Sequence, residues 1–306
     1  MAELFEQRLD YQHVTVMASE VVRSLRTERG GLFIDVTAGG GGHSAAILES
    51  NADCRIIAFD RDPEAVLAAS ARLSSFGERA RVVRASFDEI EAYLSDRVAE
   101  PVAGLVADLG VSSHQLDDPE RGMSFRSEGP LDMRMDPEHG ETARELIARV
   151  SQDQLADLIY AYGEERRSRR VARCIKQALE KDELDSTLDL RRAVVRAVGP
   201  RRVGGIDPAT RTFQALRIAV NGELDQLERL LAFAASRLPP GAMAAFISFH
   251  SLEDRMVKRA LRARDVWLPS TKKPELASPL EQAENPRARS AKLRAAERVT
   301  AEEAPR

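Results

Sequence analysis

Residues 32–44 read LFIDVTAGGGGHS, an apolar run that leads into four consecutive glycines. The β-branched and apolar run at 32–37 predicts a short strand, and a helical pattern follows from Ser44 to Ser50. Glycines at such a junction let the backbone take positive φ and let a ligand approach closely. The helix N-terminus adds unpaired N–H groups and a partial positive charge. This stretch therefore predicts a nucleotide-like binding site at a strand-to-helix turn.

The alternation of strand and helix continues on the C-terminal side of this stretch. A helix is expected from Asp62 to about Ser74, with Asp62 as N-cap and Pro63 at the first helical position. Further strands are expected at 55–60, 81–85, 102–108 and 243–249. Mostly apolar strands that alternate with helices favour a parallel sheet covered on both faces. The predicted fold class is α/β, a doubly wound Rossmann-like sheet.

The pattern breaks between Ser112 and about Arg211, where no good strand is found. Helices are expected there at 143–150, 152–162, 164–181 and 189–198, and another at 223–238. We therefore expect a discontinuous domain, 1–111 with 212–306, and a helical insert at 112–211 that recognises the substrate. The last 40 residues are rich in Pro, Ala and charge and are expected to mix irregular chain with loosely held segments.

Composition narrows the class of protein. The chain has 306 residues, 45 Lys plus Arg, 49 Asp plus Glu and a net charge of -4. The two cysteines, Cys54 and Cys174, form neither a disulfide framework nor a zinc pair, and no metal site is expected. No signal peptide and no run of about 18 apolar residues is found, which favours a cytoplasmic protein. The mild acidity argues, as an average, against a nucleic-acid binder.

The residues around the glycines favour an adenosine cofactor. Asp60 stands 18 residues after Gly42 at the end of the next strand, where a carboxylate can accept both ribose hydroxyls. Residues 40–45 formally match G-x-G-x-x-G/A, so a dinucleotide remains open. S-adenosylmethionine enzymes of the doubly wound class use the same geometry and often carry an acid after the fourth strand, where Asp108 lies. A glycine turn without a ligand is the simplest alternative, and His43 could merely cap the helix.

Seven longer motifs are too specific to be ordinary loop sequence. They are DLGVSSHQLD at 108–117, RGMSF at 121–125, GPLDMRMD at 129–136, GEER at 163–166, PATRTFQALRI at 208–218, ISFHSLEDR at 247–255 and NPRARSAKLR at 285–294. With these motifs the chain resembles the MraW/RsmH family from about Tyr11 to about Arg298. The family comprises bacterial methyltransferases that use S-adenosyl-L-methionine to methylate N4 of a cytidine in the decoding region of 16S ribosomal RNA. The resemblance implies a doubly wound methyltransferase domain with a helical insert after the fourth strand.

The resemblance also implies cofactor contacts. They are Gly41, Gly42 and His43 in the loop, Asp60 on the ribose, Phe87 near the adenine, Asp108 and Gln115. Phe87 could instead be ordinary core, and Gln115 an N-cap or loop residue. The chain departs from the family pattern at His114, Thr15 and Met123, none of which is a proposed cofactor contact.

Methylation of an exocyclic amine needs an acceptor that holds the amine and takes up positive charge. Asp108 is the candidate, and His250, at the end of the returning strand, is a weaker one. The aromatic residue that stacks on the base could be Phe125, Phe213 or Phe249. A structural hydrogen-bonding role for His250 stays open.

Three basic clusters suggest that RNA is bound, within a 30S subunit or a late precursor. The clusters are Arg166, Arg167, Arg169, Arg170, Arg173 and Lys176; Arg191, Arg192, Arg196, Arg201, Arg202 and Arg211; and Arg255, Lys258, Arg259, Arg262 and Arg264. A solvated face explains any one cluster equally well. Two rival functions stay open: a nicotinamide-dependent oxidoreductase and a non-catalytic ribosome-assembly factor.

Overall fold

The computed structural model describes residues 15–200 and 206–300, so Arg201 and Arg202 lie outside the described residues. The chain forms two compact units. The first comprises the described residues up to Gly110 and those from Leu224 onward, and the second comprises Val111–Glu223. The second unit extends beyond the expected insert of 112–211, because helix α11 (Thr210–Asn221) packs against helix α8 (Gln152–Gly163).

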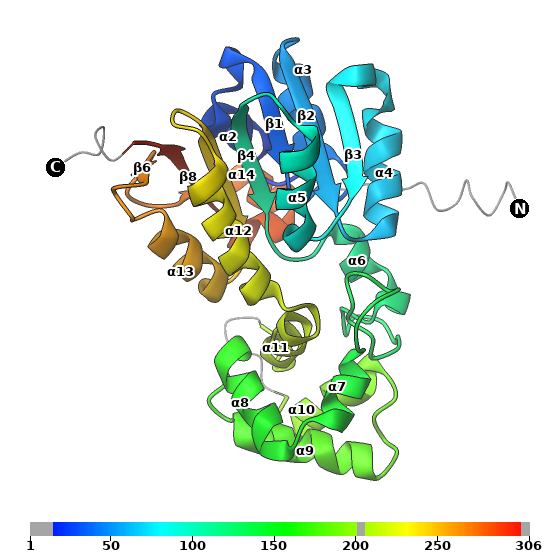
Figure 1. The fold of residues 1–306 in the computed structure, drawn as a ribbon. Coiled ribbons are helices and arrows are strands. Elements are labelled where there is room, and N and C mark those ends of the chain that lie inside the picture. Colours follow the sequence, from blue (N-terminus) through cyan, green and yellow to red (C-terminus); the bar gives the residue numbers. More distant parts are fainter. Residues whose placement is uncertain (1–14, 201–205, 301–306) are drawn as a thin grey trace, which may run out of the picture. The chain divides into compact units, whose positions relative to one another are not determined.

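The first unit is built on one sheet with the strand order β3-β2-β1-β4-β5-β8-β6, and β7 also pairs with β8 (Figure 1). The strands are β1 (Gly31–Asp35), β2 (Cys54–Asp60), β3 (Ala80–Arg84), β4 (Val102–Asp108), β5 (Met243–Ser248), β6 (Trp267–Pro269), β7 (Glu275–Leu276) and β8 (Lys292–Arg298). The five strands from β3 to β5 are parallel, as expected, and β8 is antiparallel to β5. The predicted doubly wound α/β fold is confirmed.

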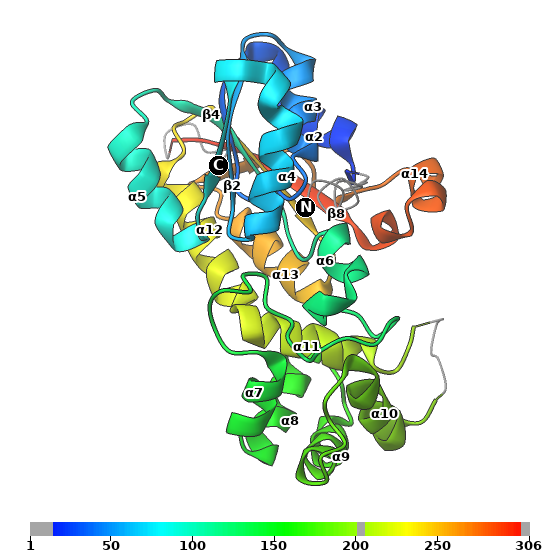
Figure 2. The same ribbon diagram turned by 90° about the vertical axis from the view of Figure 1, so that its right-hand side faces the viewer.

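Helices cover both faces of this sheet. Since successive side chains of a strand point to opposite faces, neighbouring residues of one strand pack into different cores. On β1, Phe33 packs into the core under α2, α3 and α4, while Ile34 packs into the core under α5, α12 and α13. Figure 2 shows α2 and α5 on opposite sides of the sheet. The helices of this unit are α2 (Ala18–Leu25), α3 (Gly42–Ser50), α4 (Pro63–Leu73), α5 (Phe87–Arg97), α12 (Glu223–Arg237), α13 (Ser251–Ala260) and α14 (Pro279–Glu284).

The expectation that the C-terminal segment mixes irregular chain with loosely held segments is wrong for residues 292–298, which form a strand inside the sheet. Strand β8 lies between β5 and β6 and pairs antiparallel with both. Its sequence KLRAAER buries Leu293, Ala295 and Ala296 while its charged side chains stay partly exposed. Arg294 donates to Asp254 Oδ1 at 2.7 Å. Alanine and charged residues are poor strand formers, so the pairing with β5 decides this strand rather than propensity.

The second unit is helical and has a core of its own. Its helices are α6 (Ser113–Asp117), α7 (Ala143–Arg149), α8 (Gln152–Gly163), α9 (Ser168–Glu180), α10 (Thr187–Val198) and α11 (Thr210–Asn221). The helix expected over 164–181 starts at Ser168 instead. Glu164 takes φ +52° and closes α8 by donating its N–H to Tyr160 O, so the chain must turn before α9 begins.

Two further expectations concern the cysteines and membrane-spanning segments. Cys54 and Cys174 are both buried free thiols. Within the described part of the chain, no helix has the length and apolar character needed to cross a membrane.

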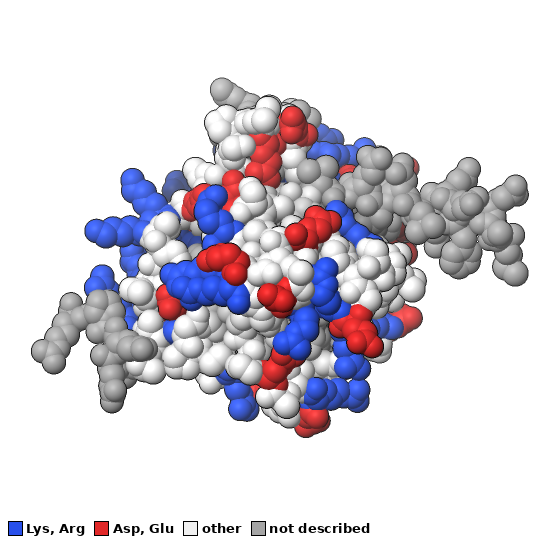
Figure 3. Space-filling view, turned by 90° about the horizontal axis from the view of Figure 1, so that it is seen from above, with Lys and Arg blue, Asp and Glu red and all other residues white. Residues whose placement is uncertain are grey.

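On the face drawn in Figure 3, Lys and Arg side chains are interspersed with Asp and Glu, so this face offers no continuous basic surface.

Candidate active site

Three acids meet at the carboxyl edge of the parallel strands. Asp35, Asp60 and Asp108 are the last residues of β1, β2 and β4. The strand order reverses direction between β1 and β4, and doubly wound sheets bind ligands in the crevice at such a point. The candidate site is therefore placed by topology, and the glycine loop after β1 borders it.

The glycines of the loop serve two different purposes. Gly41 has φ +74°, and a Cβ there would lie 3.2 Å from the Ala69 Cα. A Cβ on Gly42 would lie 1.7 Å from Thr15 Oγ1. A side chain at position 41 would therefore strain the backbone, and one at position 42 would require Thr15 to move. Gly39 has φ +49° and its Cβ would meet only Thr37 O, at 3.9 Å, so this part of the loop is where a ligand can approach closely.

Asp60 is held by the loop that it faces. Its Oδ2 accepts from the Gly39 N–H at 2.8 Å, and its Oδ1 accepts from the Asp62 N–H at 2.9 Å. Burial raises the pKa of Asp60 to about 6. Each oxygen accepts one backbone bond and retains a second lone pair. The carboxylate can therefore still accept the two hydroxyls of a ribose.

His43 is a buried, neutral side chain and not the cap of α3, whose N-cap is Gly41. Its Nε2 lies 2.9 Å from Val16 O, and a carbonyl can only accept, so the proton is on Nε2. Burial lowers the pKa of His43 to about 4. The unprotonated Nδ1 faces Asp108, with Oδ2 at 3.8 Å.

Asp108 carries the feature that points most directly to a ligand. Its Oδ1 is buried and has no hydrogen-bond partner in the described structure. Burial, together with the charges of Asp35 and Glu253, raises the pKa of Asp108 well above its usual range. A buried oxygen without a partner is costly. A donor or a positive charge from a bound molecule would relieve that cost.

The structure gives Phe87 and Gln115 local roles. Phe87 is the first residue of α5 and packs, partly buried, on the core beneath that helix. Gln115 lies in the second unit, where its Oε1 accepts from the Ser112 N–H at 3.0 Å in a capping box of α6. The cofactor contacts expected of these two residues remain predictions.

His250 has a structural role at the start of α13. Its Nδ1 accepts from the Glu253 N–H at 3.4 Å, and Glu253 Oε2 accepts from the His250 N–H at 3.2 Å. These two bonds form a reciprocal cap of the helix. The alternative of a structural histidine thus has a geometric basis, and a catalytic role stays a prediction.

Two of the three candidate aromatic residues are engaged elsewhere. Phe125 and Phe213 stack edge to face, with ring centroids 4.9 Å apart, on the core of the second unit. Phe249 is partly buried in the first unit, directly after β5. A Cβ on Gly110 would lie 3.6 Å from its ring, so Phe249 borders the end of β4.

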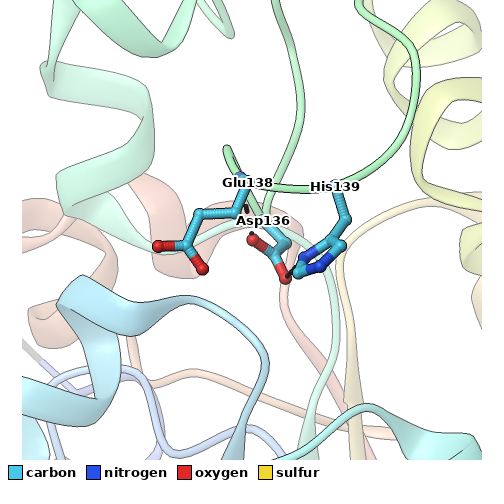
Figure 4. A group of neighbouring side chains, drawn as sticks. All are labelled: Asp136, Glu138 and His139. Atoms are coloured by element: carbon cyan, nitrogen blue, oxygen red, sulfur yellow. Dashed lines mark hydrogen bonds and ion pairs between the residues drawn. The ribbon is translucent and has the colours of Figure 1, made fainter.

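A group of possible metal ligands lies in the second unit, in a loop before α7 (Figure 4). The Glu138 N–H donates to Asp136 Oδ1 at 3.0 Å, and His139 Nδ1 lies 3.1 Å from Asp136 Oδ2. These bonds are those of an aspartate that closes a turn. His139 and Glu138 are exposed, and no ion is assigned to the group.

The predicted RNA-binding residues divide into engaged and unengaged side chains. Arg167 donates to Val198 O, Arg169 pairs with Asp157 at 2.7 Å, and Arg211 donates to Glu164 O. In contrast, the exposed side chains of the following residues make no ion pair or hydrogen bond within the described residues: Arg166, Arg170 and Arg173. On α13, Arg255 is exposed and Lys258 is partly buried.

A sequence model of the MraW methylase family matches residues 10–299, nearly the whole chain. The chain belongs to the MraW methylase family. The resemblance noted from the motifs is thereby confirmed.

Curated relatives of this methylase are similar along nearly their whole length. "Ribosomal RNA small subunit methyltransferase H" of Sorangium cellulosum is 63% identical over 293 residues, which cover 96% of this chain and 93% of that protein. The proteins of the same name from Prochlorococcus marinus strain MIT 9303 and Synechococcus elongatus are 54% and 50% identical. They cover 94% and 97% of this chain and 94% and 98% of their own lengths.

The cofactor of this methylase is S-adenosyl-L-methionine, which excludes the nicotinamide alternative. The residues at the carboxyl edge fit that molecule. Asp60 has lone pairs for the ribose, and the cofactor contact expected of Asp108 stays a prediction. Three acids, the buried Asp35 and the partly buried Asp60 and Asp108, also suit a cofactor that carries a positively charged sulfonium.

Proposed function

We propose that this methylase transfers a methyl group to N4 of a cytidine in the decoding region of 16S ribosomal RNA. The unpartnered, buried Asp108 Oδ1 beside the glycine loop is the observation that carries the proposal, because it can accept a hydrogen bond from a donor such as an amine. The names of the curated relatives, all ribosomal RNA small subunit methyltransferases, support an RNA substrate.

The chemistry requires positioning and an acceptor. The amine of cytosine is a poor nucleophile, because its lone pair is delocalised into the ring. When bound, S-adenosylmethionine supplies an electrophilic methyl group on a sulfonium that leaves as a neutral thioether. Asp108 accepts a hydrogen bond from the amine, orients its lone pair, stabilises the positive charge that develops on nitrogen and takes up the proton that the nitrogen then loses.

Phe249 is the aromatic residue that we propose to stack on the target base. It lies at the carboxyl end of β5, and β5 is the neighbour of β4, which ends in Asp108. Base–aromatic stacking contributes roughly 1–3 kcal/mol per base. In this arrangement the ring holds the flat base while Asp108 holds its amine.

In this proposal, the RNA backbone is held by arginines whose side chains make no ion pair or hydrogen bond within the described residues. Replacing Arg166, Arg170 and Arg173 together by glutamine should lower the slope of log affinity against log salt. The expected decrease is about 0.7 for each lost contact with a single strand, or about 2 in total. Filter binding of a decoding-region RNA across a series of salt concentrations measures this slope.

The matched control is Arg169→Gln, because Asp153 and Asp157 already hold the Arg169 guanidinium. This variant should keep the slope of the wild-type protein. An unchanged slope in the triple variant would show that these three arginines do not contact phosphates.

The deciding experiment compares 30S particles with naked 16S RNA as methyl acceptors and maps the modified base. A labelled methyl on cytosine N4 in the decoding region supports the proposal. A methyl on another atom or at another site would contradict it, and no transfer to either acceptor would favour a non-catalytic assembly factor. A thermal-shift series in which S-adenosylhomocysteine stabilises the protein checks that the preparation binds its cofactor.

A further inference from the structure

The backbone of Asp108 is held in an unusual way at the end of β4. The ladder between β1 and β4 ends where the Val36 N–H donates to Val106 O at 3.1 Å. Beyond this bond the β1 chain turns into the glycine loop and offers no further backbone partner. The Asp108 N–H donates instead to the hydroxyl Oγ1 of Thr37 at 2.6 Å. A side chain thus adds one more bond to the ladder at the point where the strands separate.

The Thr37 hydroxyl is itself oriented by a buried acid. Thr37 donates to Asp35 Oδ1 through its N–H at 3.0 Å and through its hydroxyl at 3.4 Å. The other oxygen, Asp35 Oδ2, accepts from the hydroxyl of Ser44 at 2.7 Å. A hydroxyl has one proton and two lone pairs. Because its proton points to Asp35, a lone pair of Thr37 is available for the Asp108 amide.

The carboxyl group of Asp108 depends on this attachment. Its Oδ1 has no hydrogen-bond partner within the described structure, and the unprotonated Nδ1 of His43 lies 3.8 Å from its Oδ2. The side chain therefore has no fixed partner that would correct a shift of its own backbone. The position of the Asp108 carboxyl group follows from the position of the end of β4.

We propose that Thr37 is a positioning residue for methyl transfer, whose hydroxyl fixes the end of β4 so that the Asp108 carboxyl group meets the reacting amine. This inference rests on the role of Asp108 in the proposed function. Displacements of about 1 Å in a catalytic group can cost about 100-fold in rate. Thr37 acts through Asp108.

Two substitutions test the hydroxyl. Thr37→Val keeps the size of the side chain and removes the acceptor, and Thr37→Ser keeps the hydroxyl. For Thr37→Val we expect kcat to fall about 10- to 100-fold with KM for S-adenosylmethionine within about threefold, while the Asp108 amide exchanges its proton at least about tenfold faster in the free protein. Thr37→Ser should restore kcat and the exchange rate to within about threefold.

The control is Thr27→Val. Thr27 is a buried threonine of the first unit, and its hydroxyl accepts from Ser50 at 2.8 Å away from the site. This variant should leave kcat and the exchange of the Asp108 amide unchanged. Wild-type kcat in Thr37→Val, or a Thr37→Ser variant as slow as Thr37→Val, would overturn the positioning role.

Asp108→Asn, measured in the same assays, separates this inference from the proposed function. Full turnover in Asp108→Asn would remove the proposed role of Asp108 and the positioning role of Thr37 with it. An impaired Asp108→Asn beside a fully active Thr37→Val would overturn the positioning role alone.

Discussion

Replacing Asp108 by asparagine is expected to lower kcat about 100- to 1,000-fold while the protein stays folded. The amide has nearly the shape of the carboxylate but cannot neutralise the positive charge that develops on the amine, and loss of one such electrostatic contact typically has this effect. Turnover at saturating S-adenosylmethionine and RNA measures the change. Circular dichroism and binding of S-adenosylhomocysteine show whether the fold and the cofactor site are retained.

The pH dependence of the wild-type enzyme gives a second measurement of the same group. The pKa of Asp108 is raised well above its usual range by burial and by its acidic neighbours. Since the ionised form is the acceptor, kcat should rise with pH through a pKa higher than that of an ordinary aspartate. A flat profile together with normal turnover in Asp108→Asn would exclude Asp108 as the acceptor.

Replacing Asp60 by alanine should raise the dissociation constant of S-adenosylhomocysteine about 100-fold or more. The carboxylate is expected to accept both ribose hydroxyls, and charge-assisted bonds contribute roughly 1.5–3 kcal/mol each. The substitution also removes the acceptor of the Gly39 N–H, which orients the loop. Isothermal titration calorimetry measures the change, and Asp60→Asn should fall between alanine and wild type.

Cofactor affinity should also depend on pH below neutrality. The pKa of Asp60 is raised to about 6, so the carboxylate that accepts the hydroxyls is formed above that pH and lost below it. The affinity for S-adenosylhomocysteine should therefore fall by up to about tenfold per pH unit below pH 6, and Asp60→Asn should lack this dependence. A wild-type affinity that stays constant from pH 5 to pH 7 would show that Asp60 does not bind in its ionised form.

Much of the first unit could be predicted because its strands are short, apolar and followed by clear signals. The acids at the ends of β2 and β4 and the glycines after β1 predict a candidate site at the carboxyl edge of the sheet. Pro63 and Asp62 marked the start of α4, and the side chain of Asp62 accepts from the Glu64 N–H at 3.0 Å. These features depend on residues that are close together in the chain, and such local interactions can be predicted directly from a sequence.

Other features depend on partners that are distant in the chain. Strand β8 is stabilised by pairing with β5, about fifty residues earlier, and its own residues favour no strand. The clash that a side chain at position 42 would make comes from Thr15, which precedes the first strand. The role of Thr37 was missed because its partner Asp108 lies 71 residues away. A threonine before a glycine run gives no signal of such a bond.

The adjacency of β4 and β5 has a consequence for how the newly made chain folds. These strands pair from Gly104 with Met243 to Asp108 with Ile247, yet the whole second unit lies between them in the chain. Contacts between residues so far apart form slowly, whereas helices packed on their neighbours form fast. During synthesis, the edge of β4 that later pairs with β5 therefore stays unpaired until the second unit and β5 have been made. An unpaired strand edge of this kind is prone to aggregation.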